Sequence, residues 1–247
     1  MTPVRFRHEF KCFLSFVWRP NLTRHVPRST ALTGWPADWW PNISLARLLA
    51  WAATLWCLNL LVLGPVVLAV FELSGATHRI NVNDLPWLQA ILWAPLVEEL
   101  LFRFSLRRPV MALGLIPLLV IVLLNGLAWW ANSLLALTIA LLWWVSARTV
   151  APRALGYQWL RRYRRVFPFV MHLSVLGFAG LHIKNFVFVE VEWWMMVVLV
   201  TPQWVTGLAL SWVRMQRGVG ASILLHSFFN AGPLSVVWVA LQMMGDG

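Results

Sequence analysis

Residues 109–147 contain no charged side chain, and this long apolar stretch is the feature that most constrains the fold. A second uncharged stretch covers residues 48–71. A helix that crosses a bilayer needs about 20 consecutive, mostly apolar residues. Hydrophobic residues make up 60% of the 247 residues, and charged residues only 12%. We therefore predict an all-α polytopic membrane protein, and these features exclude a soluble globular domain.

Apolar segments separated by charged or polar ones predict about seven transmembrane helices, with an active site inside the bundle. The expected spans are residues 48–71, 85–102, 110–127, 130–147, 167–183, 193–213 and 219–244. The chain then divides into a basic, aromatic leader at 1–47 and a transmembrane helical domain at 48–247. Three helices of that domain carry the polar motifs described below, near 85–108, 167–183 and 219–244.

The leader has two possible structures. Its apolar residues Phe6, Phe10, Phe13 and Val17 recur at helical spacing, which predicts a short amphipathic helix lying in the membrane interface. The alternative is a disordered basic tail. The composition of residues 1–47 is compatible with both.

The net charge of +11 is explained by membrane topology. If the N-terminus is cytoplasmic, eighteen of the twenty Lys and Arg residues fall in cytoplasmic segments, and only Arg79 and Lys184 fall outside. This asymmetry predicts a multi-pass protein of a bacterial inner (cytoplasmic) membrane, whose basic faces contact anionic lipid headgroups. It leaves no reason to expect a nucleic-acid partner.

Three charged residues interrupt the span at 85–102 and its end: Glu98, Glu99 and Arg103. A charge at bilayer depth costs about 2.5–3.5 kcal/mol on insertion scales, so these residues need a functional or structural reason. Glu99 and Arg103 are four residues apart and share a helix face as an ion pair. Glu98 points about 100° away and is free for chemistry.

Two later spans supply matching polar groups. His182 stands alone among apolar residues, and His226 and Asn230 lie one helical turn apart. A carboxylate in a poorly solvated pocket is a good base for activating water, His182 could share that water, and His226 and Asn230 could donate to an oxyanion. No serine or cysteine lies in a recognisable nucleophile motif, so we expect direct attack by water.

Together these residues resemble a known family. Glu98-Glu99-x-x-x-Arg103, Phe178-x-x-x-His182 and His226-x-x-x-Asn230 look like the three ordered motifs of the CPBP intramembrane proteases, also called the ABI or CaaX-protease family. The family includes the type II CaaX prenyl endopeptidases. The resemblance covers roughly residues 85–245. It implies a membrane-embedded helical fold and peptide-bond hydrolysis, with water activated by Glu98 and His182 and an oxyanion hole made by His226 and Asn230.

The chain departs from the family pattern in two places. Phe104 follows the motif arginine where glycine is common, and the interval from Glu99 to His182 is longer by about one helical hairpin, at 110–147. A hairpin preserves topology, so the site can still close. The substrate stays open: a prenylated CaaX tail, a sorting tag, a bacteriocin-like peptide or another membrane-bound or lipidated protein all fit.

Alternatives to a metal-free protease follow from the same residues. Glu98, His182 and His226 could bind catalytic zinc, although no His-Glu-x-x-His spacing supports it, so we expect no cofactor. A non-catalytic membrane scaffold or immunity-type binder of the same fold is the main alternative function. A transporter with a proton-relay carboxylate is a third, and the lack of titratable groups in residues 193–213 speaks against it.

Overall fold

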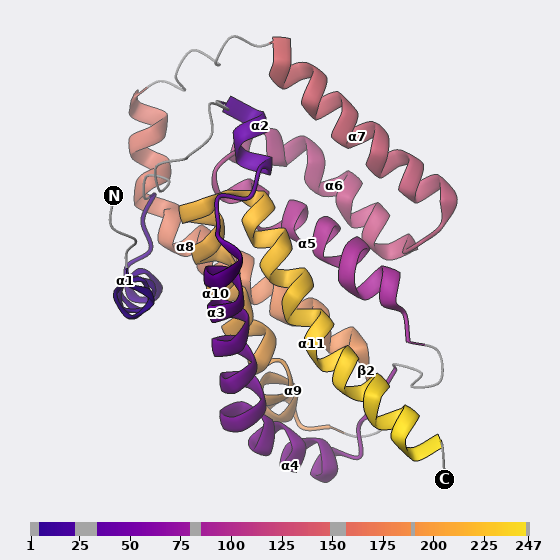
Figure 1. Ribbon diagram of the computed structural model, residues 1–247. Helices are drawn as coiled ribbons and strands as arrows, with labels where there is room; N and C mark the ends of the chain where they lie inside the picture. The colour runs from indigo at the N-terminus through magenta and orange to yellow at the C-terminus, as the bar shows by residue number, and fades with distance from the viewer. Residues whose placement is uncertain (1–4, 23–33, 80–84, 149–156, 189–190, 246–247) are drawn as a thin grey trace.

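The computed structural model describes residues 5–22, 34–79, 85–148, 157–188 and 191–245, and about 85% of it is helical (Figure 1). Three helical stretches are long and apolar enough to cross a membrane: Leu45–Ser74, Gln158–Asn185 and Val219–Met243. A bent pair, Trp193–Leu199 and Thr201–Arg217, makes a fourth. A helical chain with three or four such spans is therefore confirmed, whereas the expected seven spans exceed what helix length and composition establish.

The first long helix is continuous from Leu45 to Ser74, as expected for 48–71. Helix α3, Leu45–Cys57, begins where the Ser44 hydroxyl accepts a hydrogen bond from the Arg47 amide at 3.3 Å. A wider π-helical turn, η1 (Leu58–Leu63), leads into α4, Gly64–Ser74. The helix ends at Gly75, whose φ of 59° is in the left-handed region that glycine adopts without strain.

The helix that carries the two glutamates is shorter than expected. A π-helical turn, η2 (Gln89–Trp93), precedes α5 (Ala94–Phe102), and a 3-10 turn, η3 (Phe104–Leu106), follows it. Pro95 was expected to kink this segment, and the π-helical turn lies directly before it.

The expected hairpin follows as α6, Pro109–Asn125, and α7, Trp129–Arg148, with ends within two residues of the predicted ones. Gly126, with φ of 57°, ends α6. The Trp93 indole N–H donates to Asn132 Oδ1 of α7 at 2.8 Å. The hairpin therefore packs beside α5, on the side of the bundle seen at upper right in Figure 1.

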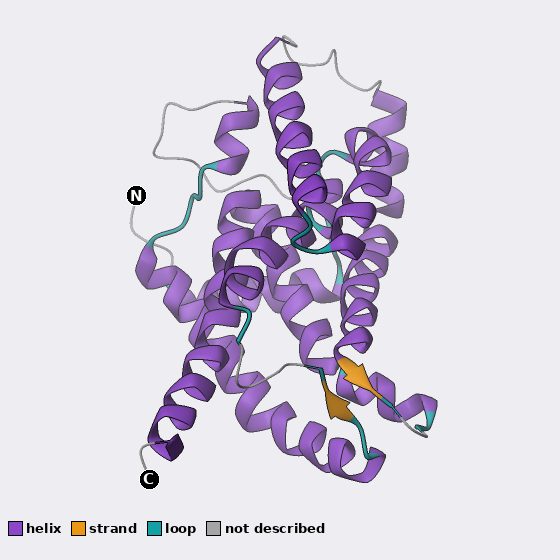
Figure 2. Ribbon diagram, turned by 90° about the vertical axis from the view of Figure 1, so that its right-hand side faces the viewer, coloured by secondary structure: helices purple, strands orange, loops and turns teal. Residues whose placement is uncertain are grey.

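The remaining helices are α8 (Tyr157–Leu181), α9 (Trp193–Leu199), α10 (Thr201–Arg217) and α11 (Val219–Gly245). The expected span at 193–213 is thus broken, with a 46° bend between α9 and α10. After α8 come a 3-10 turn, η4 (His182–Asn185), and strand β2 (Phe186–Val187). Strand β2 pairs antiparallel with β1 (Thr77–His78), His78 opposite Phe186, at one end of the helices (Figure 2).

The leader contains two helices, α1 (Phe6–Trp18) and α2 (Gly34–Trp39), and α1 confirms the expected helix. The apolar face of α1 packs on the protein: Phe13 and Phe16 are buried, and the Phe6 and Phe13 rings meet the Trp51 ring edge-on at 5.3 Å. This face therefore packs on α3 and α10, and the interfacial position of the helix stays a prediction. Residues 23–33 and the connector residues 149–156 lie outside the described part of the chain.

Two acidic side chains fix the leader to the helices. Glu9 of α1 accepts hydrogen bonds from Arg217 at 3.0 Å and from the Trp51 indole at 3.2 Å. Asp38 of α2 is buried, and Arg214 of α10 binds both of its carboxylate oxygens, at 2.5 and 2.9 Å. The Asp38–Arg214 pair is buried and the Glu9–Arg217 pair is partly buried, so the leader is packed as part of the helical body.

The buried apolar residues form two main clusters. The larger joins α1, α3, α8, α10 and α11, around Trp51, Phe167 and Phe178. The second joins α5, α6 and α7, around Val97, Phe104 and Leu119. Helix α5 contributes to the second cluster and packs against α11 and α8 of the first. Its two glutamates therefore lie where the two halves of the bundle meet.

Candidate active site

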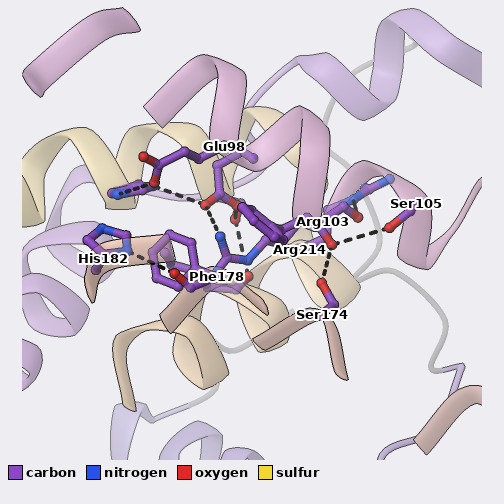
Figure 3. A network of polar contacts seen from close by, with 12 residues as sticks. Glu98, Arg103, Ser105, Ser174, Phe178, His182 and Arg214 are labelled. Atoms are coloured by element: carbon purple, nitrogen blue, oxygen red, sulfur yellow. Dashed lines mark hydrogen bonds and ion pairs between the residues drawn. The ribbon is translucent and has the colours of Figure 1, made fainter. Parts of the chain in front are cut away.

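The three motifs converge on one cavity. Glu98 comes from α5, and Phe178 and His182 come from the end of α8 and its 3-10 turn (Figure 3). His226 and Asn230 come from α11. All five line a cavity of about 840 Å³. Glu99 and Arg103 lie behind its wall, fully buried. The structure thus brings together every residue that the sequence singled out, and the α6–α7 hairpin does not separate them.

Glu99 is the centre of a buried polar network. Its Oε1 accepts a hydrogen bond from Arg103 Nη1 at 3.0 Å and lies 3.0 Å from His226 Nδ1. Its Oε2 accepts a hydrogen bond from the Ser222 hydroxyl. A buried carboxylate is stable only when charges and donors surround it. Here the Arg103 guanidinium, the His226 imidazole and the Ser222 hydroxyl do so. The ion pair that the spacing of Glu99 and Arg103 predicted is therefore confirmed.

The contact with Glu99 sets the orientation of His226. A carboxylate beside an arginine accepts hydrogen bonds, so the proton of the His226–Glu99 contact lies on Nδ1. The opposite ring nitrogen, Nε2, lies 3.8 Å from Glu98 Oε2 and faces the cavity. His226 thus connects the two neighbouring glutamates, one on each side of its ring.

Glu98 has a buried carboxylate oxygen that accepts no hydrogen bond from the described part of the chain. Its side chain is buried, with 7% of the residue exposed, and its Oε2 has no hydrogen-bond partner among the described residues. A buried carboxylate oxygen without a donor is costly unless water or a ligand supplies one. Because Glu98 lines the cavity, that donor would come from the cavity contents.

His182 has a fixed tautomer as well. It is the first residue of η4, and its Nδ1 lies 2.8 Å from the Phe178 carbonyl oxygen. A carbonyl oxygen only accepts, so Nδ1 carries the proton and Nε2 of the neutral ring is a proton acceptor. His182 therefore presents a basic nitrogen rather than a donor to the cavity.

Phe178 separates the arginine from the two imidazoles. The Arg103 guanidinium carbon lies 3.8 Å from the centre of the Phe178 ring, a cation–π contact. The same ring meets those of His182 and His226 edge-on, with centroids 4.7 and 5.6 Å apart. Gly207 of α10 makes room for this stack, since a Cβ there would lie 3.1 Å from Arg103 Nη2 and from Phe178 Cδ1.

Asn230 is held by a carbonyl that a proline leaves without a donor. In η2 the Ala94 amide bonds the Gln89 carbonyl, so the Ala90 carbonyl would need the amide of residue 95, which is proline. Asn230 Nδ2 donates to that Ala90 oxygen at 2.8 Å. The carboxamide is thereby fixed at the cavity wall, a contact that the motif spacing did not predict.

Pro233 of α11 leaves a second carbonyl without its helical donor, that of Phe229. The Trp56 indole of α3 donates to this oxygen at 3.0 Å. Gly232 allows the approach, because a Cβ there would come within 2.4 Å of the Trp56 ring. The contact ties the first long helix to the helix that carries His226 and Asn230.

Sequence reasoning missed two groups that support the site. Ser222 lies one turn before His226, and the spacing Ser222, His226, Asn230 on one face of α11 is the signal that could have found it. Arg214 donates from Nε to the Arg103 carbonyl at 3.0 Å while it binds Asp38. This second contact joins the leader to the end of the glutamate helix, and no local sequence pattern predicts it.

Within the described ranges, no three His, Cys, Asp or Glu side chains are arranged to hold a metal ion. Comparison of the chain with protein families, with curated proteins and with solved structures yields no match.

Proposed function

We propose that the protein is an intramembrane endopeptidase that hydrolyses a peptide bond of a membrane-bound or lipidated substrate, in the manner of the CPBP family that its motifs resemble. The observation that carries the proposal is the Glu98 carboxylate: its Oε2 is buried and accepts no hydrogen bond from the described residues, in a cavity that it shares with two tautomer-fixed imidazoles. A structural carboxylate would have its oxygens satisfied, as those of Glu99 are.

The first step is addition of water to the substrate carbonyl. A water held between Glu98 and His182 Nε2 gives one proton to the Glu98 carboxylate, and its oxygen forms a bond to the carbonyl carbon. The carbonyl π electrons move to oxygen, giving a tetrahedral oxyanion. His226, when protonated on both nitrogens, donates from Nε2 to that oxyanion while Nδ1 stays on Glu99, and the Asn230 amide supplies a second donor.

In the second step the intermediate collapses. The oxyanion re-forms the carbonyl, the carbon–nitrogen bond breaks, and Glu98 returns its proton to the leaving nitrogen. The products are a carboxylic acid and an amine, and Glu98 ends as a carboxylate. Glu99 and Arg103 take no part in bond making and hold His226 in place.

The proposed setting is a bacterial inner membrane crossed seven times, with the N-terminus in the cytoplasm. The charge distribution supports it, because nearly all Lys and Arg residues then lie on one side. The helices η2–α5, α6 and α7 would cross the membrane beside the longer helices that surround them. The membrane-facing surface is rich in exposed apolar residues, including Leu113, Leu61 and Phe169, as a lipid contact requires.

The test is cleavage of a library of membrane-spanning and lipidated peptides by purified protein in nanodiscs. Wild type, Glu98→Gln and His226→Ala are compared with and without a chelator, and thermal unfolding checks that each variant folds. We expect wild-type cleavage to survive the chelator and both variants to lose it. Loss with chelator alone would indicate zinc, and cleavage by Glu98→Gln equal to that of wild type would refute the mechanism.

One observation favours the alternative of a non-catalytic scaffold or immunity-type binder: the Asn230 amide is already bonded to the Ala90 carbonyl, a structural use. A scaffold would keep its cellular phenotype in the Glu98→Gln variant. A protease would lose it.

A further inference from the structure

We propose that Gln203 and Thr206 of α10 form a subsite that binds one backbone peptide group of the substrate. The inference rests on the proposed function and identifies the part of the same cavity that binds the polypeptide backbone. Both residues line the cavity that Glu98, His182 and His226 also line. Neither belongs to the three motifs, and neither contacts the Glu99 network.

Gln203 supplies an acceptor. Its Oε1 is buried and has no hydrogen-bond partner among the described residues, the same condition as Glu98 Oε2. A buried carboxamide oxygen without a donor costs free energy in the empty protein. An N–H group placed in the cavity would remove that cost.

Thr206 supplies a donor. It is one helical turn after Gln203, on the same face of α10, and only 1% of it is exposed. Its Oγ1 accepts a hydrogen bond from Asn59 Nδ2 at 3.4 Å, and Asn59 is itself anchored to the Leu55 carbonyl at 2.8 Å. With the oxygen occupied as an acceptor, the hydroxyl hydrogen is available, because Thr206 donates to no other group among the described residues.

An acceptor and a donor one turn apart match a peptide group. A backbone amide carries one N–H and one C=O, so the N–H satisfies Gln203 Oε1 while the carbonyl accepts from the Thr206 hydroxyl. A hydrocarbon chain would leave both groups unpaired. Because Gln203 and Thr206 line the same cavity as Glu98, such a bond would fix the substrate chain in that cavity without taking part in the chemistry.

The test measures whether a change in the substrate backbone and a substitution in the protein have coupled effects on binding. Fluorescent membrane-spanning peptides are made as all-amide chains and as single backbone esters, in which one N–H is replaced by oxygen. Their binding to the cleavage-deficient Glu98→Gln protein in nanodiscs is compared with binding to the same protein carrying Gln203→Leu, Thr206→Val, Thr206→Ser or, as a matched control, Gln158→Leu. Gln158 is exposed at the start of α8 and does not line the cavity.

We expect one ester position to weaken binding about tenfold, the scale of one buried hydrogen bond, and Gln203→Leu to abolish that sensitivity. Thr206→Val should weaken binding of the all-amide peptide, whereas Thr206→Ser and Gln158→Leu should not. Thr206→Val nearly preserves shape, so it decides the question if Gln203→Leu does not fold. The subsite is overturned if Gln203→Leu changes the effect of no ester position and if Thr206→Val binds the all-amide peptide as tightly as Thr206→Ser.

Parallel cleavage of the all-amide peptides by the wild-type protein separates the two proposals. Cleavage without coupling overturns the subsite and leaves the protease in place. Coupling without cleavage supports the subsite and overturns the protease. Peptides that are neither bound nor cleaved overturn both.

Discussion

Arg214 binds both carboxylate oxygens of Asp38 although 176 residues separate them, and both side chains are buried. The guanidinium also donates to the Arg103 carbonyl, where the glutamate helix ends. The leader therefore neutralises a charge that would otherwise be buried beside the candidate active site.

Replacement of Asp38 by Asn should destabilise the protein strongly. Breaking one partner of a buried ion pair leaves an uncompensated charge and costs about 3–5 kcal/mol. Thermal or denaturant unfolding in detergent measures the loss. Glu72→Gln removes one exposed carboxylate and should change the free energy of unfolding by less than about 0.5 kcal/mol. Equal effects of the two variants would contradict a stabilising role for the ion pair.

The same Glu-to-Gln substitution should have different effects at the two neighbouring glutamates: it should lower stability at Glu99 and cleavage at Glu98. Glu99→Gln deprives the buried Arg103 of its counter-charge, so it should lower the free energy of unfolding by about 3–5 kcal/mol. Glu98→Gln breaks no hydrogen bond to Oε2 among the described residues and should leave stability nearly unchanged while lowering cleavage about 10²–10⁴-fold. Unfolding curves and cleavage rates of both variants are the measurements, and a stable, inactive Glu99→Gln protein would reverse the assignment.

Gly207→Ala should crowd the Arg103–Phe178 stack. The new methyl group would lie 3.1 Å from Arg103 Nη2, Phe178 Cδ1 and Val175 Cγ1, so packing must shift, at a cost of about 1–3 kcal/mol. Gly180→Ala is the matched control: it lies exposed in α8 with no atom within 4 Å of the added Cβ, and should stabilise by about 0.5–1 kcal/mol. A Gly207→Ala protein as stable as wild type would show that the stack has spare room.

Trp56→Phe and Pro233→Ala should be non-additive. Trp56→Phe leaves the Phe229 carbonyl without a donor, at a cost of about 1–3 kcal/mol. Pro233→Ala restores the amide that bonds this carbonyl in a regular helix, so the double variant should recover most of the loss. A double-mutant cycle on the free energy of unfolding measures the coupling, and simple additivity would mean that the indole bond contributes little.

The helices followed from local sequence, because apolar runs and turn residues such as Gly126 act within a few residues. The convergence of Glu98, His182 and His226 was predicted through the resemblance of the ordered motifs and through i,i+4 spacing. Whether these residues catalyse hydrolysis stays a prediction.

Other features depend on partners distant in sequence and left no local signal. The docking of α1 on Trp51 and the pairing of Asp38 with Arg214 both require knowledge of which helix lies opposite. The break at Val200 was missed because residues 193–213 carry no charge, although Pro202 two residues later was a local signal for it.

Helix α11 is held by three side chains along one stripe. Ser222 bonds Glu99, His226 bonds Glu99, and Asn230 bonds the Ala90 carbonyl, so each turn of the stripe is attached to η2 or α5. Successive residues of a helix differ by about 100° in direction, and a rotation of that size would break all three contacts together. The angular setting of α11 is therefore discrete: the imidazole either faces Glu98 with all three attachments made, or it leaves the site with none.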